Sequence, residues 1–307
     1  MKKAALVTPH AGFLPADVGA SVGDYVSLLK PRVMSLVVFS GLAGLLVAPG
    51  HIHPLIGFVA ILCIALASGG SAAINMWFDR DIDAVMHRTR NRAIPAGRLL
   101  PEAALELGGT FIFAAVALMW LAVNGLAACL LAFAAGFYIF VYTMWLKRRT
   151  PQNIVIGGAA GAFPPVIGWA AVTGGIAWPA VVLFLIIFIW TPPHFWALAL
   201  YRNEDYRRAQ IPMMPVIKGE RRTKIEMLLY TLLLFPLSLA PAWLNIAGPV
   251  YFGAAVLLSG VFVVCALRVL RDRTHKAARQ MFAYSILYLT LLLTVLMAEH
   301  VVRGIGS

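Results

Sequence analysis

The sequence contains few charged residues, and acids are the scarcer kind. Only 12% of its 307 residues are charged, whereas 61% are hydrophobic. Asp and Glu together number 13, against 25 Lys and Arg. A soluble domain has no use for so much apolar surface, because its exterior must be polar. The scarcity of charge therefore excludes an ordinary soluble protein.

Cysteine is also scarce. Cys63, Cys129 and Cys265 each fall within a different apolar segment and show neither metal-ligand spacing nor a disulfide pattern. We interpret all three as small core residues. The N-terminal segment lacks a continuous apolar stretch and a clear cleavage site, so we expect a flexible cytoplasmic arm over residues 1–29 and not a signal peptide.

Long apolar runs are what the sequence has in abundance. Runs of this length are typical of transmembrane helices. We predict an all-α polytopic membrane protein whose single domain, residues 30–307, is a bundle of nine transmembrane helices around a central cavity. The predicted spans are 33–49, 55–78, 104–122, 126–145, 153–172, 179–201, 226–244, 249–267 and 281–301. We expect Pro164–Pro165 and Pro192–Pro193 to break two of these helices.

The basic residues occupy only alternate connections between the spans. Residues 1–32 and four alternate loops hold 24 of the 25 Lys and Arg, and the last is Arg303. This asymmetry indicates membrane orientation and argues against a nucleic-acid partner. It predicts a cytoplasmic N-terminus and a periplasmic C-terminus in the inner (cytoplasmic) membrane, with the lipid bilayer as surroundings. Eight spans would break the alternation.

A polar face ends the second predicted span. Asn75, Asp79 and Asp83 are spaced four apart, so a helix places them on one face, while Asp81 points to the other side. Two stacked carboxylates repel each other unless a cation lies between them. Oxygen ligands of this kind suit Mg²⁺, which completes its shell with phosphate oxygens and water. Alternatively, the acids are only the solvated end of the helix.

Basic residues follow this face and recur in the next cytoplasmic loop. Guanidinium is a good partner for phosphate, so the sequence predicts a Mg²⁺–diphosphate site at the membrane surface. The candidate diphosphate-binding residues are Arg88, Arg90, Lys147, Arg148 and Arg149. For the last three, anchoring of the helix end at the membrane is the alternative.

A second group of polar and aromatic residues lies around the proline pair of span six. If the helix continues, His194, Tyr201 and Asp205 share one stripe. A histidine within a span is a functional candidate, although a hydrogen bond to a neighbouring helix would also explain it. The aromatic residues are either part of a lipid-facing belt or the lining of a pocket for an isoprenoid or a flat macrocycle. They are Trp190, Phe195 and Trp196.

The spacing of Asn75, Asp79 and Asp83 resembles the first aspartate-rich motif of the intramembrane aromatic (UbiA-type) prenyltransferases. Three further stretches resemble the protohaem farnesyltransferase (haem O synthase) branch of this superfamily: Lys30-Pro31-Arg32, the run Tyr142–Trp169, and the run Thr191–Tyr206 with the following IPMMPV. The resemblance covers residues 24–300. Relatives usually carry a second paired-acid motif after span six; here Asn203, Glu204 and Asp205 stand in its place, and the paired spacing is lost.

The resemblance implies an enzyme that transfers farnesyl from farnesyl diphosphate to a vinyl group of haem B. Water adds to the same vinyl group, giving haem O and diphosphate for terminal oxidases. It implies Mg²⁺ as cofactor and, as protein partners, a haem A synthase or oxidase assembly proteins. The implied catalytic residues are Asn75, Asp79, Asp83, His194 and Asp205, of which all but His194 are also metal ligands. The candidates for contact with haem or the prenyl chain are Lys30, Arg32, Asn153, Trp190, Phe195 and Trp196.

Two alternatives stay open on the sequence. One is a prenyltransferase acting on another aromatic acceptor such as 4-hydroxybenzoate. The other is a cation-coupled transporter, since intramembrane acids and broken helices also occur there. The clustering of the acids at one surface, and not at the midplane, argues against the transporter.

Overall fold

The computed structural model describes residues 19–305, and within this range the chain is helical, with no strand. The predicted all-α membrane fold is thus confirmed. Residues 1–18 of the predicted arm lie outside the described part, but Val22–Leu28 of the same segment forms a short helix, α1. A capping box between Ser21 and Asp24 begins this helix, and Leu28 at its end is fully buried.

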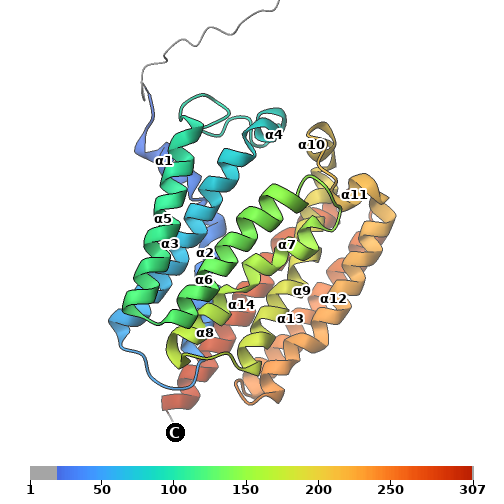
Figure 1. Cartoon of the computed structure of the whole chain (residues 1–307). Helices are drawn as coiled ribbons and strands as arrows, with labels where there is room; N and C mark the ends of the chain where they lie inside the picture. The colour runs from blue at the N-terminus through green and yellow to red at the C-terminus, as the bar shows by residue number, and fades with distance from the viewer. Residues whose placement is uncertain (1–18, 306–307) are drawn as a thin grey trace, which may run out of the picture.

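The long helices run roughly parallel or antiparallel to one another and make up the body of the molecule (Figure 1). They are α2 (Pro31–Leu46), α3 (Pro54–Phe78), α5 (Pro101–Ala122), α6 (Gly125–Gly136) continued by the π-helix η1 (Phe137–Leu146), α7 (Asn153–Ala162), α8 (Pro164–Thr173), α9 (Trp178–Tyr201), α12 (Gly219–Trp243), α13 (Pro249–Arg271) and α14 (Lys276–Ile305). Three short helices connect them, namely α4 (Arg80–Val85), α10 (Asn203–Arg208) and α11 (Met214–Ile217).

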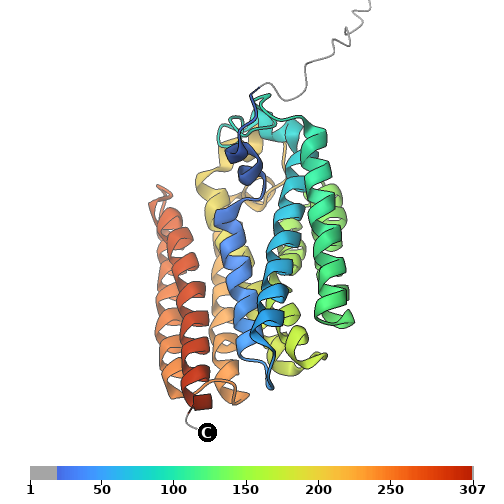
Figure 2. The same cartoon turned by 90° about the vertical axis from the view of Figure 1, so that its left-hand side faces the viewer.

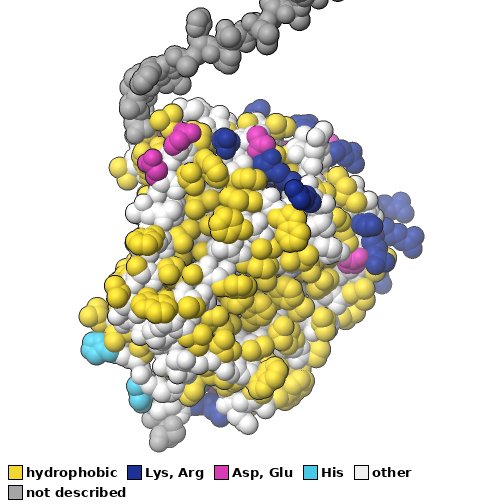
Figure 3. All heavy atoms as spheres, in the orientation of Figure 1, with side chains coloured by type: hydrophobic (Ala, Val, Ile, Leu, Met, Phe, Trp, Pro, Cys, Tyr) yellow, Lys and Arg dark blue, Asp and Glu magenta, His cyan; other side chains and the backbone are white. Residues whose placement is uncertain are grey.

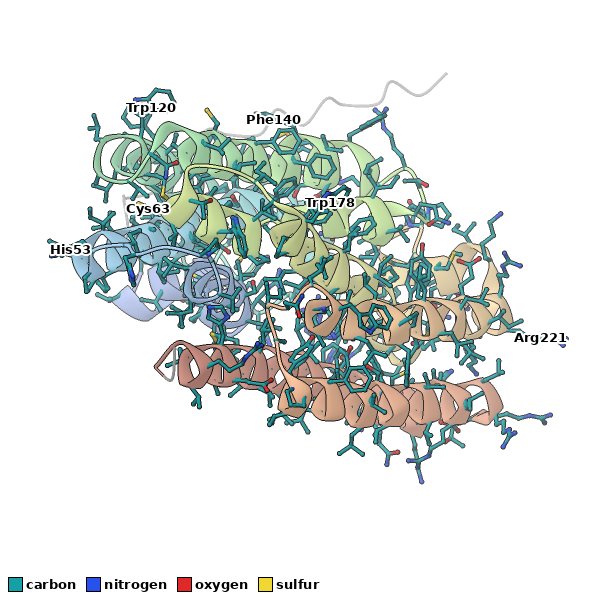
Figure 4. All side chains as sticks on the ribbon, turned by 90° about the horizontal axis from the view of Figure 1, so that it is seen from below. His53, Cys63, Trp120, Phe140, Trp178 and Arg221 are labelled. Atoms are coloured by element: carbon teal, nitrogen blue, oxygen red, sulfur yellow. The ribbon has the colours of Figure 1, made fainter. Side chains whose placement is uncertain are left out.

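Eight of these segments are long and apolar enough to cross a membrane, with α6–η1 and α7–α8 each counted as one. The pair α1–α2, bent by 50°, makes a ninth if it is taken as one span. Hydrophobic side chains form a broad band around the visible face, whereas Lys and Arg gather near one end (Figure 3). Trp120 and Phe140, exposed by 58% and 65%, lie at the edge of the bundle and point away from it (Figure 4). This surface matches a lipid-facing exterior, so the chain is a multi-pass membrane protein.

The helices close into a ring. Helix α2 packs against α3, α8 and α14, and thereby joins the first and last parts of the chain (Figure 2). The contact between α2 and α8 is close because glycines line it: a Cβ at Gly44 would lie 1.9 Å from the Pro165 carbonyl oxygen, and one at Gly168 2.1 Å from that of Gly41. Such small residues let membrane helices approach each other.

The two proline pairs behave differently. The chain breaks between α7 and α8 at Phe163, directly before Pro164, as predicted. The predicted break at Pro192–Pro193 is wrong, since α9 continues through both residues. Proline removes a donor, but its fixed φ fits a helix, and both prolines here are buried among neighbouring helices that hold the segment in place.

Candidate active site

One end of the bundle carries α1, α4 and α10, and we call it the charged end (Figure 1). Helix α3 ends at Phe78, and α4 begins two residues later. The backbone bonds from Asp79 N to Asn75 O (2.9 Å) and from Asp83 N to Asp79 O (2.8 Å) bridge this joint. The helical register therefore persists across it, as the spacing of these residues predicted.

The polar face formed by Asn75, Asp79 and Asp83 is buried. The exposed fractions of these residues are 4%, 1% and 4%. The Asn75 amide donates a hydrogen bond of 2.8 Å to Asp79 Oδ2, so the two side chains act as one unit. By contrast, the Asp81 side chain is 59% exposed, on the opposite side. Burial of two carboxylates is costly unless they are paired, and their partners define the site.

Three cations from distant parts of the chain converge on this face. Lys147 forms an ion pair with Asp79 Oδ2. The Arg92 guanidinium lies 2.6 Å from Asp83 Oδ2, and the Lys30 ammonium donates a hydrogen bond of 2.9 Å to Asn75 Oδ1. Lys30 adopts a left-handed backbone with φ of 49°, which costs a non-glycine residue roughly 1–2 kcal/mol. Strained residues of this kind cluster at functional sites.

The π-helix η1 supplies further contacts with this face. Thr143 is fully buried and accepts a hydrogen bond of 3.2 Å from the Asn75 amide through its Oγ1. Lys147 directly follows the π-helix, and its backbone N–H donates to the carbonyl of Tyr142, five residues earlier. Wider helical turns are rare and often mark functional sites. Here the segment brings Thr143 and Lys147 to the same pair of side chains, Asn75 and Asp79.

The side-chain oxygen atoms of this face are of the kind that binds a small hard cation. Asp79 Oδ1 is buried and has no hydrogen-bond partner, although Arg148 approaches it to 3.8 Å. Asn75 Oδ1 faces Lys30, so Asn75 can bind a metal only if Lys30 gives up this oxygen. Within residues 19–305, no three His, Cys, Asp or Glu side chains come together as a metal cluster. Asp205 stands apart on α10, where it accepts the His87 backbone N–H at 3.2 Å.

The other predicted diphosphate ligands lie in the loops that follow α4 and η1. Arg148 binds Asp81 through two contacts of 2.7 Å, and these hydrogen bonds hold the pKa of Asp81 below its ordinary value. Arg88, Arg90 and Arg149 are exposed and form no ion pair with any described residue. These loops therefore carry three exposed guanidiniums without a carboxylate partner among the described residues.

His194 lies in an aromatic stack between α9 and α14. Its ring lies between Trp190 and Phe282, with centroids 4.3 and 4.6 Å away, and meets Phe195 edge-on at 5.0 Å. Ser285 Oγ donates to the Phe282 carbonyl at 2.6 Å and lies 2.6 Å from His194 Nδ1. Because the single hydroxyl proton of Ser285 is donated to Phe282, His194 Nδ1–H donates to Ser285 Oγ. The other ring nitrogen, Nε2, then carries the free lone pair.

The remaining candidates for substrate contact fall into different environments. Phe195 belongs to an apolar cluster with Ile82 and Tyr142, and its ring also meets that of His194. Trp196 is fully buried and faces Tyr230 on α12 instead. Asn153 is buried at the start of α7, where its Oδ1 has no partner. Arg32 is exposed.

Sequence reasoning missed Thr143, the pairing of Arg92 with Asp83 and the position of Lys30 beside Asn75. It placed Lys30 with the haem or prenyl chain. Arg92 lies nine residues from its partner and could have been found in the arginine-rich loop. Lys30 and Thr143 are 45 and 68 residues from Asn75, and no local pattern in the sequence points to them.

Known proteins resemble this chain both in sequence and in fold. Residues 37–292 match the model of the UbiA prenyltransferase family. The chain is 55% identical to protoheme IX farnesyltransferase of Acidiphilium cryptum, over 98% of both chains, and 57% identical to that of Gluconacetobacter diazotrophicus, over 94% of both. Its fold resembles a UbiA homologue of Archaeoglobus fulgidus bound to GPP and Mg²⁺, with a TM-score of 0.65, 16% identity and coverage of 89% of this chain and 99% of the other. It also resembles a digeranylgeranylglyceryl phosphate synthase, with a TM-score of 0.75, 18% identity and coverage of 91% and 98%.

Proposed function

The chain belongs to the UbiA prenyltransferase family and is a prenyltransferase, and from this premise we propose that it farnesylates haem B. Farnesyl diphosphate would lose diphosphate as its C1–O bond breaks, and C1 would bond to a vinyl carbon of haem. Water would add its oxygen to the other vinyl carbon and release a proton, giving haem O. The two curated relatives described above carry the name protoheme IX farnesyltransferase, which supports this acceptor.

The buried face of Asn75, Asp79 and Asp83, with three cations against it, is the observation that carries the proposal. Diphosphate leaves readily only when its growing charge is neutralised. Lys147, Arg148 and Lys30 are placed to do this, and Arg88, Arg90 and Arg149 would attract the diphosphate to the rim.

The same face would hold Mg²⁺. Asp79 and Asp83 would be its protein ligands, joined by Asn75 when Lys30 turns to the substrate, and Asp205 would serve a second ion. When bound, Mg²⁺ supplies positive charge to the diphosphate oxygens. The unpartnered Asp79 Oδ1 supports this assignment.

The apolar cluster beneath this face would shield the allylic cation from water. Phe195 and Tyr142 belong to this cluster, and their ring faces attract positive charge. Phe195 also contacts the ring of His194. We place the haem on that side, with His194 Nε2 directed at the iron, because Ser285 already engages Nδ1. Trp190, Trp196 and Asn153 would shape the walls of this region.

The orientation follows from the distribution of basic residues. Lys and Arg in alternate connections support a protein of the inner membrane with a cytoplasmic charged end. Mg²⁺ would then reach the site from the cytoplasm, and the diphosphate group of the substrate would lie at the cytoplasmic side of the membrane.

The test is a comparison of acceptors. Purified protein is incubated with Mg²⁺ and farnesyl diphosphate, with either haem B or 4-hydroxybenzoate, and the products are identified by mass spectrometry. We expect farnesylated haem only, and none after chelation of Mg²⁺. Farnesylated 4-hydroxybenzoate together with unchanged haem would overturn the proposal.

A further inference from the structure

A pocket opens at the charged end, and Asp205 forms part of its wall. Its volume is about 410 Å³, and its walls come from the end of α9, from α10, from the start of α12 and from the α13–α14 connection. The His87–Asp205 hydrogen bond lies in its wall. Apart from Asp205, which would also serve the second Mg²⁺ ion, no residue of this pocket contacts the buried polar face in the part of the chain that the structure describes.

The pocket contains guanidinium groups that no carboxylate neutralises. Arg202 and Arg208 line it, and neither forms an ion pair with a described residue. Arg279 of α14, equally without a described ion-pair partner, lies 5.5 Å from the centre of the Tyr201 ring, and Arg202 lies 5.8 Å from it. Two arginines without a described ion-pair partner, one between α9 and α10 and one on α14, thus meet at one aromatic ring.

Each acid in the pocket wall has a partner other than these arginines. Glu220 pairs with His275 at 3.0 Å, and Asp205 accepts the His87 N–H. Glu204 pairs with Arg207, which does not itself line the pocket. The guanidinium groups of Arg202, Arg208 and Arg279 therefore keep their hydrogen-bond donors free of any described carboxylate, and such donors suit a carboxylate or phosphate ligand.

Aromatic contacts join this pocket to His194. The Phe282 ring stacks on His194 at 4.6 Å and meets the Tyr201 ring at 6.1 Å. Tyr201 is seven residues beyond His194 on α9, so it lies about 10 Å closer to the charged end. A flat macrocycle with its iron at His194 would direct its acidic edge toward this pocket.

We propose that Arg202 and Arg279 bind the propionate carboxylates of the acceptor haem at the mouth of this pocket. This inference rests on the proposed function, because that function supplies the haem. It fixes the orientation of the macrocycle: the propionates lie at the membrane surface, and the opposite edge lies deeper in the bundle. The vinyl groups then reach the apolar region around Phe195.

The experiment compares haem B with its dimethyl ester, in which both carboxylates are masked. Each is titrated into detergent-purified protein and followed by its absorbance. The wild type is compared with the double variant Arg202→Gln/Arg279→Gln. Arg221→Gln/Arg273→Gln is the matched control, because it also removes two charges from the same end of the protein, at exposed arginines that do not line the pocket and form no ion pair with a described residue.

The wild type should bind haem B at least about tenfold more tightly than the ester, as charged hydrogen bonds predict. The double variant should bind haem B as weakly as the ester, with its ester affinity unchanged, and Arg221→Gln/Arg273→Gln should match the wild type. The unchanged ester affinity also shows that the variant is folded.

Two results would overturn the inference while leaving the proposed function intact. One is equal haem B affinity in the wild type and the double variant; loss of co-purified anionic phospholipid from the variant would then assign the arginines to a lipid headgroup. The other is an equal loss of affinity for haem B and its ester. By contrast, a wild type that binds no haem B and forms no product would overturn the proposed function itself.

Discussion

Replacement of Asp79 by Asn is the perturbation that separates chemistry from folding most sharply. Asp79 is 1% exposed and joins Lys147 to the Asn75 amide. Alanine at this position would break a buried ion pair, which costs about 3–5 kcal/mol, so a loss of activity could reflect unfolding. Asparagine also removes the charge that pairs with Lys147, but it keeps the shape and one acceptor oxygen for the Lys147 ammonium, whose side chain is 18% exposed, so its cost should be smaller, about 1–3 kcal/mol.

The effect of Asp79→Asn on turnover should be larger than its effect on stability. The variant loses the negative charge that would hold Mg²⁺ against diphosphate. Loss of one such electrostatic contact typically lowers kcat by about 10²–10³-fold. The assay is the rate of haem farnesylation at saturating haem B and farnesyl diphosphate, with thermal unfolding in detergent measured on the same preparation.

Asp81→Asn is the matched control. Asp81 is two residues away, and its side chain is 59% exposed and paired with Arg148. An exposed ion pair of this kind is worth roughly 0–1 kcal/mol, so turnover should fall by no more than about fivefold. The reasoning is refuted if Asp81→Asn proves the more damaging change, or if Asp79→Asn retains near-normal turnover.

Three further predictions follow from the same geometry. Thr143→Val removes the acceptor 3.2 Å from the Asn75 amide and should lower kcat/KM by about fivefold, corresponding to roughly 1 kcal/mol; unchanged kinetics would show that Thr143 does not orient Asn75. His194→Gln should weaken haem B binding, measured by difference absorbance, while farnesyl diphosphate binding is retained, and normal haem binding with normal product yield would leave His194 with a structural role only. Reporter fusions should give a cytoplasmic signal at Gly97 and a periplasmic signal at Gly175 and Ser307, and a cytoplasmic signal at Ser307 would contradict nine spans.

The parts of the site that sequence predicted are those that local geometry determines. Asn75, Asp79 and Asp83 lie one helical turn apart, so their common face follows from the helical period. The outward direction of Asp81 follows from the same period, and the structure confirms it. The apolar runs likewise determine the membrane helices, because only helices and closed barrels satisfy the backbone within lipid.

The parts that sequence did not predict depend on packing between distant segments. Lys30 reaches Asn75 because α1 and α2 meet at 50° with a left-handed residue between them. Thr143 reaches Asn75 from the π-helix η1, and hydrophobic periodicity in the sequence does not reveal a π-helix. The error at Pro192–Pro193 has a similar origin, since burial on all sides keeps α9 intact where the local rule predicts a break.

The mass of the haem product formed in oxygen-18-labelled water tests the central claim most directly. The purified protein is supplied with Mg²⁺, farnesyl diphosphate and haem B, and the product is analysed by mass spectrometry. We predict a haem that has gained one farnesyl group and one labelled hydroxyl group at the same vinyl position, with release of diphosphate. Labelled farnesol with unmodified haem would contradict the account, because the enzyme would then ionise the diphosphate without delivering the cation to haem.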